Sequence, residues 1–258
     1  MAVPVTQEEM RSPLYEYYQL DIAPTPPEKA AQIMAGNFDP AGALHPRDMN
    51  RLFDEGYLPG EFGWWSLEDG GMVLANLTPM PGVKPEMFDW WFAWHGLASM
   101  RYKIWDKDDH YYCQTRNPEV ALNDNLSMKE RYWNTTHDIK EAMLDGQEPV
   151  DVCLTFVPPA TVGYDSEKLK DFQGTIVCTA GPVMMSHFVR PVEGGSELRT
   201  RFWFGYQWVN GKIVRVPEFT PTDMAVKALL MHNVKEFTHL AEILPSLYEK
   251  YHNDFQVK

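Results

Sequence analysis

Cysteine is scarce in this chain, with three among 258 residues and no Cys-x-x-Cys pair. The odd number and wide spacing of Cys113, Cys153 and Cys178 exclude a disulfide framework and a cysteine-rich zinc ribbon. Buried, inert thiols are the more common outcome for such residues, and a free nucleophilic thiol is the alternative. We therefore expect a protein of a reducing compartment and predict a cytoplasmic location.

Long apolar runs and positive charge are also lacking. No stretch approaches the roughly 20 apolar residues of a membrane-spanning helix, and MAVPVTQEEM lacks the basic and apolar regions of a secretory signal. The formal net charge is −13, whereas nucleic acids and anionic membranes both attract clustered Lys and Arg. We therefore expect a soluble protein with no nucleic-acid and no membrane partner.

Common catalytic motifs are missing as well, namely GxGxxG, the P-loop, HExxH and GxSxG. The acidic run Asp106, Asp108 and Asp109 lacks the glycine and the terminal glutamate of a calcium loop and is predicted to be a solvated turn. Aromatic residues, in contrast, make up 13% of the chain. They indicate either a core with large side chains or a cavity lined for a flat, apolar ligand.

Apolar patterning predicts a proline-rich beginning, a β-rich middle and a helical end. Residues 1–60 combine frequent prolines with short helical patterns, whereas residues 70–219 contain short alternating runs rich in Val, Ile, Phe and Trp. Within these runs Asn210-Gly211 is the strongest hairpin signal. After Thr222, apolar residues recur at helical spacing until Pro245, which is predicted to end the helix.

This order of elements predicts an α+β fold in which an antiparallel sheet packs on a long C-terminal helix. No repeat, linker or low-complexity tract divides the chain. We therefore predict one domain over residues 1–258, with residues 1–60 as a helical, proline-rich extension packed on it. The same extension is a candidate surface for a homo-oligomer.

The predicted C-terminal helix carries the clearest candidate for a metal site. His232 and Glu236 are four residues apart, so their side chains lie on one face of the helix. Imidazole and carboxylate suit Zn²⁺ and similar ions. The alternative is a surface pair that stabilises the helix by about 0.2–0.5 kcal/mol. His239 lies near the same face and is a competing ligand.

Three further residues are candidates with weaker signals of their own. His95, in WWFAWHGL, is either a hydrogen-bonded core histidine or a ligand that points into an aromatic cavity. Glu130 carries no signal alone, and with Ser127 it forms the S/T-x-x-E pattern of a capping box. His187 lies in a strand-like run and faces core or solvent by alternation.

Four long segments in one order resemble a known family, the 2,4-diacetylphloroglucinol hydrolases and the related phloretin hydrolases. The segments are WWFAWHGL with RYKIWDKDDHYY at 90–112, ERYWNTTH at 130–137, SHFVRPVEGGSELRTRFWFGY at 186–206 and HNVKEFTHLAEILPSLY at 232–248. Together they extend over most of the chain from about residue 60 onward.

The resemblance implies a Bet v 1-like helix-grip fold, in which a curved antiparallel sheet surrounds a long C-terminal helix and a cavity. It implies a zinc-dependent hydrolase that cleaves the carbon–carbon bond between an acyl group and a phenolic ring. Matched residue by residue, the zinc ligands fall on His95, Glu130, His232 and Glu236, and the catalytic histidine falls on His187. The implied partner is a small acylated phenol, either an acylphloroglucinol or a phloretin-like compound.

Two other functions suit the same kind of cavity. One is a non-catalytic binder of an apolar aromatic metabolite, in which the histidines are structural. The other is a metal-dependent esterase or lactonase. Nitrogen and oxygen ligands also accept Mn²⁺, Fe²⁺ or Co²⁺, so the native metal depends on geometry and availability.

Overall fold

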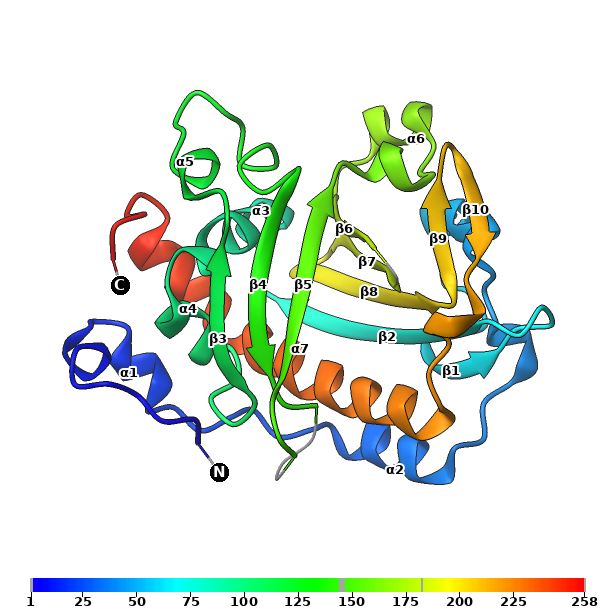
Figure 1. Cartoon of the computed structure of the whole chain (residues 1–258), viewed down its shortest axis with the longest axis horizontal. Coiled ribbons are helices and arrows are strands. Elements are labelled where there is room, and N and C mark those ends of the chain that lie inside the picture. The colour runs from blue at the N-terminus through cyan, green and yellow to red at the C-terminus, as the bar shows by residue number, and fades with distance from the viewer. Residues whose placement is uncertain (1, 144–146, 182, 258) are drawn as a thin grey trace.

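The structure is a computed structural model that describes residues 2–143, 147–181 and 183–257. Its centre is an eight-stranded antiparallel sheet in the order β1-β2-β8-β7-β6-β5-β4-β3. The sheet curves around a long C-terminal helix, α7, which lies along its concave side (Figure 1). The α+β class and the sheet that surrounds the terminal helix are therefore as predicted.

Most strands belong to this large sheet, and a short separate hairpin follows it. The strands of the sheet are β1 (Phe62–Ser66), β2 (Met72–Pro81), β3 (His110–Thr115), β4 (Thr135–Glu141), β5 (Val150–Val157), β6 (Thr175–Ala180), β7 (Val183–Val192) and β8 (Gly195–Phe204). The hairpin pairs β9 (Tyr206–Val209) with β10 (Lys212–Arg215). Its turn residues Asn210 and Gly211 both have positive φ, 48° and 76°, as a two-residue hairpin turn requires. The predicted hairpin is confirmed.

Helices are short except at the C-terminus. The α-helices are α1 (Tyr15–Tyr18), α2 (Pro27–Ala35), α3 (Pro85–Trp94), α4 (Ser99–Lys103), α5 (Pro118–Ala121), α6 (Ser166–Asp171) and α7 (Asp223–Tyr251). The 3₁₀ helices are η1 (Glu9–Arg11), η2 (Pro40–Gly42), η3 (Pro46–Phe53), η4 (His95–Leu97), η5 (Pro159–Val162) and η6 (Pro217–Phe219). No helix in the described ranges combines the length and apolarity that crossing a membrane demands.

Helix α7 begins as predicted but ends later. The Thr222 hydroxyl caps the helix by accepting a hydrogen bond of 3.3 Å from the Ala225 N–H. The helix then passes through Pro245 and ends at Tyr251, so the predicted end before Pro245 is wrong. Because Leu247 and Tyr251 are buried in the main core, their packing offsets the hydrogen bond that the proline removes.

The two faces of the sheet carry different side chains. Along β8, Phe202 and Phe204 point to the concave side, where α7 lies, and alternate with residues that point to the convex side. Residues of the N-terminal extension cover the convex side, where Leu44 and Leu52 share a core cluster with Trp203. The extension also reaches the concave side, because α2 contacts α7. The N-terminal residues therefore pack on both sides of the sheet.

Candidate metal centre and cavity

A cavity of about 320 Å³ lies between the concave face of the sheet and α7. Its wall is mainly apolar, and a volume near 300 Å³ is typical of pockets that bind small molecules. The polar lining residues are His95, Tyr102, Glu141, Thr179, His187, His232 and Glu236. The aromatic excess of the sequence therefore supplies both a core and a lined cavity.

Three of these lining residues, Glu141, His232 and Glu236, meet the buried His110 beside the cavity, and the four come from three elements. His110 and Glu141 are direct partners in the antiparallel pairing of β3 with β4, so the two strands present them side by side. His232 and Glu236 come from one face of α7, one helical turn apart. His110, His232 and Glu236 are buried, and Glu141 is half-buried.

The donor atoms lie at distances that a metal ion can bridge. His110 Nε2 is 3.6 Å from Glu236 Oε2 and 4.0 Å from Glu141 Oε2. His232 Nε2 is 4.0 Å from Glu141 Oε2 and 3.9 Å from Glu236 Oε2. Tetrahedral zinc with bonds of about 2.1 Å separates neighbouring donor atoms by about 3.4 Å. Small inward movements therefore suffice to close the group around one ion.

The second nitrogen of each imidazole faces an oxygen acceptor. His110 Nδ1 lies 3.1 Å from the Tyr102 carbonyl, which only accepts, so Nδ1 carries the proton. His110 Nε2 is then a bare lone pair, and it is buried without a hydrogen-bond partner in the described chain. His232 Nδ1 lies 3.5 Å from Asp109 Oδ2, the carboxylate–histidine arrangement that orients metal ligands. The Nε2 atoms of both rings face the carboxylates.

The electrostatics of the group favour a cation. Burial lowers the pKa of His110 well below its usual value, and the charge of His232 adds to this effect, so His110 is a neutral ligand. Burial raises the pKa of Glu236, and the nearby Glu141 carboxylate raises it further. Two carboxylates in such a site repel each other when both are ionised. A bound divalent cation would relieve that repulsion.

Comparison with protein families gives a match over most of the chain. A family model described as the DAPG hydrolase PhiG domain matches residues 44–249. The chain belongs to this family. The family resemblance expected from the sequence is therefore confirmed.

Individual members of the DAPG hydrolase family align with almost the whole chain. Phloretin hydrolase of Eubacterium ramulus is 35% identical over 274 residues, which cover 98% of this chain and 95% of the relative. The 2,4-diacetylphloroglucinol hydrolase of a Pseudomonas sp is 24% identical and covers 93% of this chain and 88% of the relative. The enzyme of that name from Pseudomonas protegens is also 24% identical, with 95% and 87% covered.

Solved structures of similar shape are more distant. The crystal structure of Ara h 8.0201 has a TM-score of 0.41 and 9% identity, and it covers 69% of this chain and 99% of its own. The solution structure of the KanY protein has a TM-score of 0.37 and 15% identity, with 67% and 94% covered.

The structure brings together only two of the four residues that the sequence predicts as ligands of this metal centre. His232 and Glu236 lie on one face of α7 as predicted, with His232 Nε2 3.9 Å from Glu236 Oε2. Glu130 is exposed and does not line the cavity: its Oε2 accepts hydrogen bonds of 2.8 Å from the Ser127 N–H and 2.6 Å from the Ser127 hydroxyl. The capping-box pattern of the sequence accounts for these contacts of Glu130.

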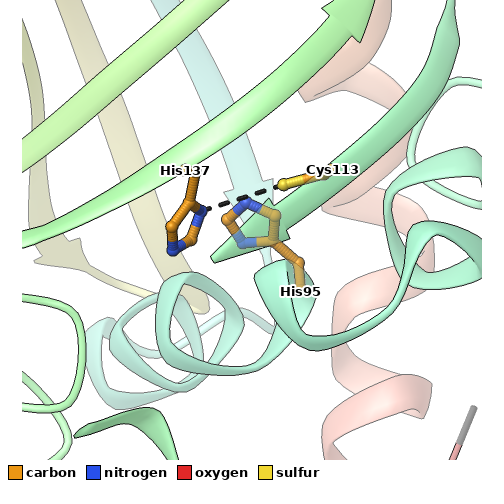
Figure 2. Close-up of side chains that lie close together, drawn as sticks. All are labelled: His95, Cys113 and His137. Atoms are coloured by element: carbon orange, nitrogen blue, oxygen red, sulfur yellow. Dashed lines mark hydrogen bonds between the residues drawn. The ribbon is translucent and has the colours of Figure 1, made fainter. Parts of the chain in front are cut away.

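His95 lines the cavity but belongs to a different group of donors. Its Nδ1 bonds to the Trp91 carbonyl at 2.9 Å, and its ring centroid lies 5.1 Å from that of His137. Figure 2 shows His95, His137 and Cys113 turned toward one another, with Cys113 Sγ 3.8 Å from His137 Nδ1. A Cβ on Gly96 would lie 2.4 Å from the His137 ring, so glycine permits this approach. These donors form a second, softer candidate group without a carboxylate.

His187 lies in the cavity wall on β7, away from the four donors. Its Nδ1 is 2.9 Å from the Thr200 hydroxyl, and Nε2 makes no hydrogen bond within the described ranges. Its ring packs 4.7 Å from Phe237, centroid to centroid. Burial lowers the pKa of His187 to about 3, so the imidazole is neutral at physiological pH. A neutral ring with one anchored nitrogen can accept or donate a proton toward the cavity.

Proposed function

We propose that the chain is a zinc-dependent hydrolase that cleaves the carbon–carbon bond between an acyl group and a phenolic ring. The observation that carries this proposal is the convergence of two imidazoles and two carboxylates beside an apolar cavity that three of them line. Membership of the DAPG hydrolase family supports the reaction class, since relatives are named for the hydrolysis of phloretin and 2,4-diacetylphloroglucinol. The proposed substrates are acylated phenols of the same class.

We propose His110, Glu141, His232 and Glu236 as the zinc ligands, with His110 and Glu141 in the places that the resemblance gave to His95 and Glu130. The set of two imidazoles and two carboxylates suits zinc, and the unpartnered Nε2 of His110 supports it. A zinc ion held there would act as a Lewis acid toward water and the acyl carbonyl.

The reaction needs a second function, which is delivery of a proton to the ring carbon. Water adds its oxygen to the acyl carbon, the bond from that carbon to the ring breaks, and the ring carbon takes a proton. The products are a carboxylic acid and the deacylated phenol. We propose that His187 transfers protons at this ring carbon, because it lines the same cavity, is not one of the proposed ligands and has one ring nitrogen anchored on Thr200.

A substrate panel with a zinc measurement tests the proposed function. Purified wild-type protein is expected to contain one zinc ion per chain, by elemental analysis, and to release the carboxylic acid from phloretin or an acylphloroglucinol. A simple aryl ester is the comparison substrate. Hydrolysis of the ester alone would favour an esterase, whereas ligand binding without turnover and without zinc would favour a non-catalytic binder.

The role of His187 is tested by His187→Gln. The amide keeps a polar group near Thr200 but cannot transfer a proton as imidazole does, so turnover is expected to fall by about 10²-fold. Zinc content is expected to stay at the wild-type level, as measured on the same sample. His252→Gln, in a histidine outside the cavity, is the matched control. A loss of zinc in His187→Gln, or unchanged turnover, would contradict the proton-transfer role.

Two minor expectations from the sequence stay predictions. The three cysteines are free thiols in the structure. The cytoplasmic, reducing location that their number suggests remains a prediction. A homo-oligomer through the N-terminal extension is tested by light scattering of the purified chain.

A further inference from the structure

We infer that Lys29, Asn76 and Asn233 form a directional chain of hydrogen bonds that positions Glu236 as a metal ligand. The inference deepens the proposed function, because it rests on the proposed zinc site. Lys29 lies on α2, in the N-terminal extension, so the inference connects the extension to that site. This lysine is outside residues 44–249, the range that the family model matches.

The chain of contacts runs from the extension through the sheet to α7. Lys29 Nζ donates to Asn76 Oδ1 at 2.7 Å and to the Leu77 carbonyl at 2.6 Å. Asn76 Nδ2 donates to Asn233 Oδ1 at 2.8 Å. Asn233 Nδ2 donates to Glu236 Oε1 at 3.0 Å. Both asparagines are fully buried, so water does not compete for these bonds.

The lysine sets the direction of every bond in this chain. An amide can present either its oxygen or its NH₂ group to a neighbour, but an ammonium group only donates. Lys29 therefore holds the oxygen of Asn76 toward itself, and the NH₂ group of Asn76 faces Asn233. Asn233 is oriented in the same sense, and its own NH₂ group is delivered to Glu236. Without the cation, both amides can reverse together and present an oxygen to the carboxylate.

The direction matters because it divides the two oxygens of Glu236 between different partners. Oε1 accepts the hydrogen bond from Asn233, whereas Oε2 is the atom near Nε2 of His110 and Nε2 of His232. A carboxylate held in this way offers one oxygen to a metal ion in a fixed orientation. Partners that orient a ligand commonly change metal affinity by 10-fold to 100-fold when they are replaced.

A purely mechanical role for Lys29 makes a different prediction. In that case its two hydrogen bonds simply hold α2 against β2, and any residue that keeps this contact preserves the site. Asn76→Asp separates the two roles. The introduced carboxylate still accepts from Lys29, now as an ion pair, but it has no NH₂ group to donate to Asn233. Asn233 is then expected to turn its NH₂ group toward position 76 and its oxygen toward Glu236.

The test measures zinc affinity by competition with a chromophoric chelator in the full-length protein. Asn76→Asp and Lys29→Met are each expected to bind zinc about 10-fold to 100-fold more weakly than wild type. The visible spectrum of the Co²⁺-loaded protein is expected to change in both, because it reports ligand geometry. Lys107→Met is the matched control, since Lys107 also ties the extension to the body, through the Leu20 carbonyl at 2.5 Å, but lies outside the chain.

The possible outcomes separate this inference from the proposed function. Wild-type zinc affinity and an unchanged Co²⁺ spectrum in Asn76→Asp and Lys29→Met would overturn the positioning chain and leave the zinc site standing. An equal loss of affinity in Lys107→Met would also overturn it, because simple anchoring of the extension would explain the result. A wild-type chain that holds no stoichiometric zinc would overturn both proposals.

Discussion

His110→Ala is expected to lose zinc and at least about 10³-fold of the hydrolytic activity, since a catalytic metal contributes several kcal/mol to the transition state and 1.36 kcal/mol is tenfold in rate. The variant removes the buried lone pair at Nε2, which lies 3.6 Å from Glu236 Oε2. Glu141→Gln is expected to show the same loss, because it removes the negative charge opposite His110 but keeps nearly the same shape. Zinc content and turnover on an acylphenol are the two measurements.

Glu130→Ala is the matched comparison for Glu141→Gln. Glu130 is exposed and bonded to Ser127, so its loss is expected to leave zinc content and turnover unchanged. The opposite pattern, with zinc kept in Glu141→Gln and lost in Glu130→Ala, would return the site to the ligands that family resemblance assigned from the sequence alone.

His95→Ala and Cys113→Ala add a second discrimination. Both residues belong to the softer group with His137, which is separate from the four proposed ligands. Zinc is expected to remain in both variants, although removal of a buried imidazole leaves a cavity and lowers stability. Loss of zinc in these two variants, with retention in His110→Ala, would place the ion in the softer group.

The part of the site that could be predicted from the sequence is the part encoded locally. His232 and Glu236 lie four residues apart in a clear helical pattern, so one helix is enough to bring them together. The same holds for the hairpin at Asn210-Gly211, because the turn chemistry depends on only two residues. Within one helix or one turn, the spacing of residues in the sequence already determines which side chains lie together.

His110 and Glu141, the other two proposed ligands, cannot be predicted from local spacing, because strand pairing brings them together. They are separated by the rest of β3, by α5 and by β4, and only the antiparallel register makes them partners. One signal was available: along β4 the residues Thr135, His137 and Ile139 are buried in alternation, and Glu141 continues that series. A carboxylate that follows an inward-facing series of this kind is a candidate for a buried site.

Glu61→Gln is expected to destabilise the protein by about 3–5 kcal/mol, the usual cost of removing one partner from a buried ion pair. Arg199 and Arg201 on β8 are fully buried on the convex face of the sheet. A buried cation without a counter-charge is strongly destabilising. The Glu61 carboxylate contacts both guanidinium groups, and Arg201 Nη2 donates to its Oε2 at 2.8 Å. A neutral amide would leave two buried cations without a counter-charge.

The pH dependence of stability gives a second, independent check on Glu61. Burial raises the pKa of this carboxyl, but the hydrogen bonds and charges of Arg199 and Arg201 outweigh burial and lower it from 4.5 to about 2. A group whose pKa is lower in the folded state stabilises the fold above the unfolded value and loses that contribution as pH falls. The wild-type advantage over Glu61→Gln is therefore full above about pH 5 and shrinks between 4.5 and about 2.

Urea unfolding at pH 7 and pH 3 measures both effects, with Glu55→Gln as the control. Glu55 is exposed and lies six residues before Glu61, so its replacement is expected to change stability little at either pH. The buried ion-pair account would be contradicted by a small difference in the free energy of unfolding between wild type and Glu61→Gln at pH 7. A difference that is equally large at pH 3 would contradict it too. The Arg199 guanidinium also donates a hydrogen bond to the Leu52 carbonyl, in the N-terminal extension, at 2.7 Å. A large difference in unfolding free energy that becomes smaller in acid would therefore mean that the charge of Glu61 holds the extension on the convex face.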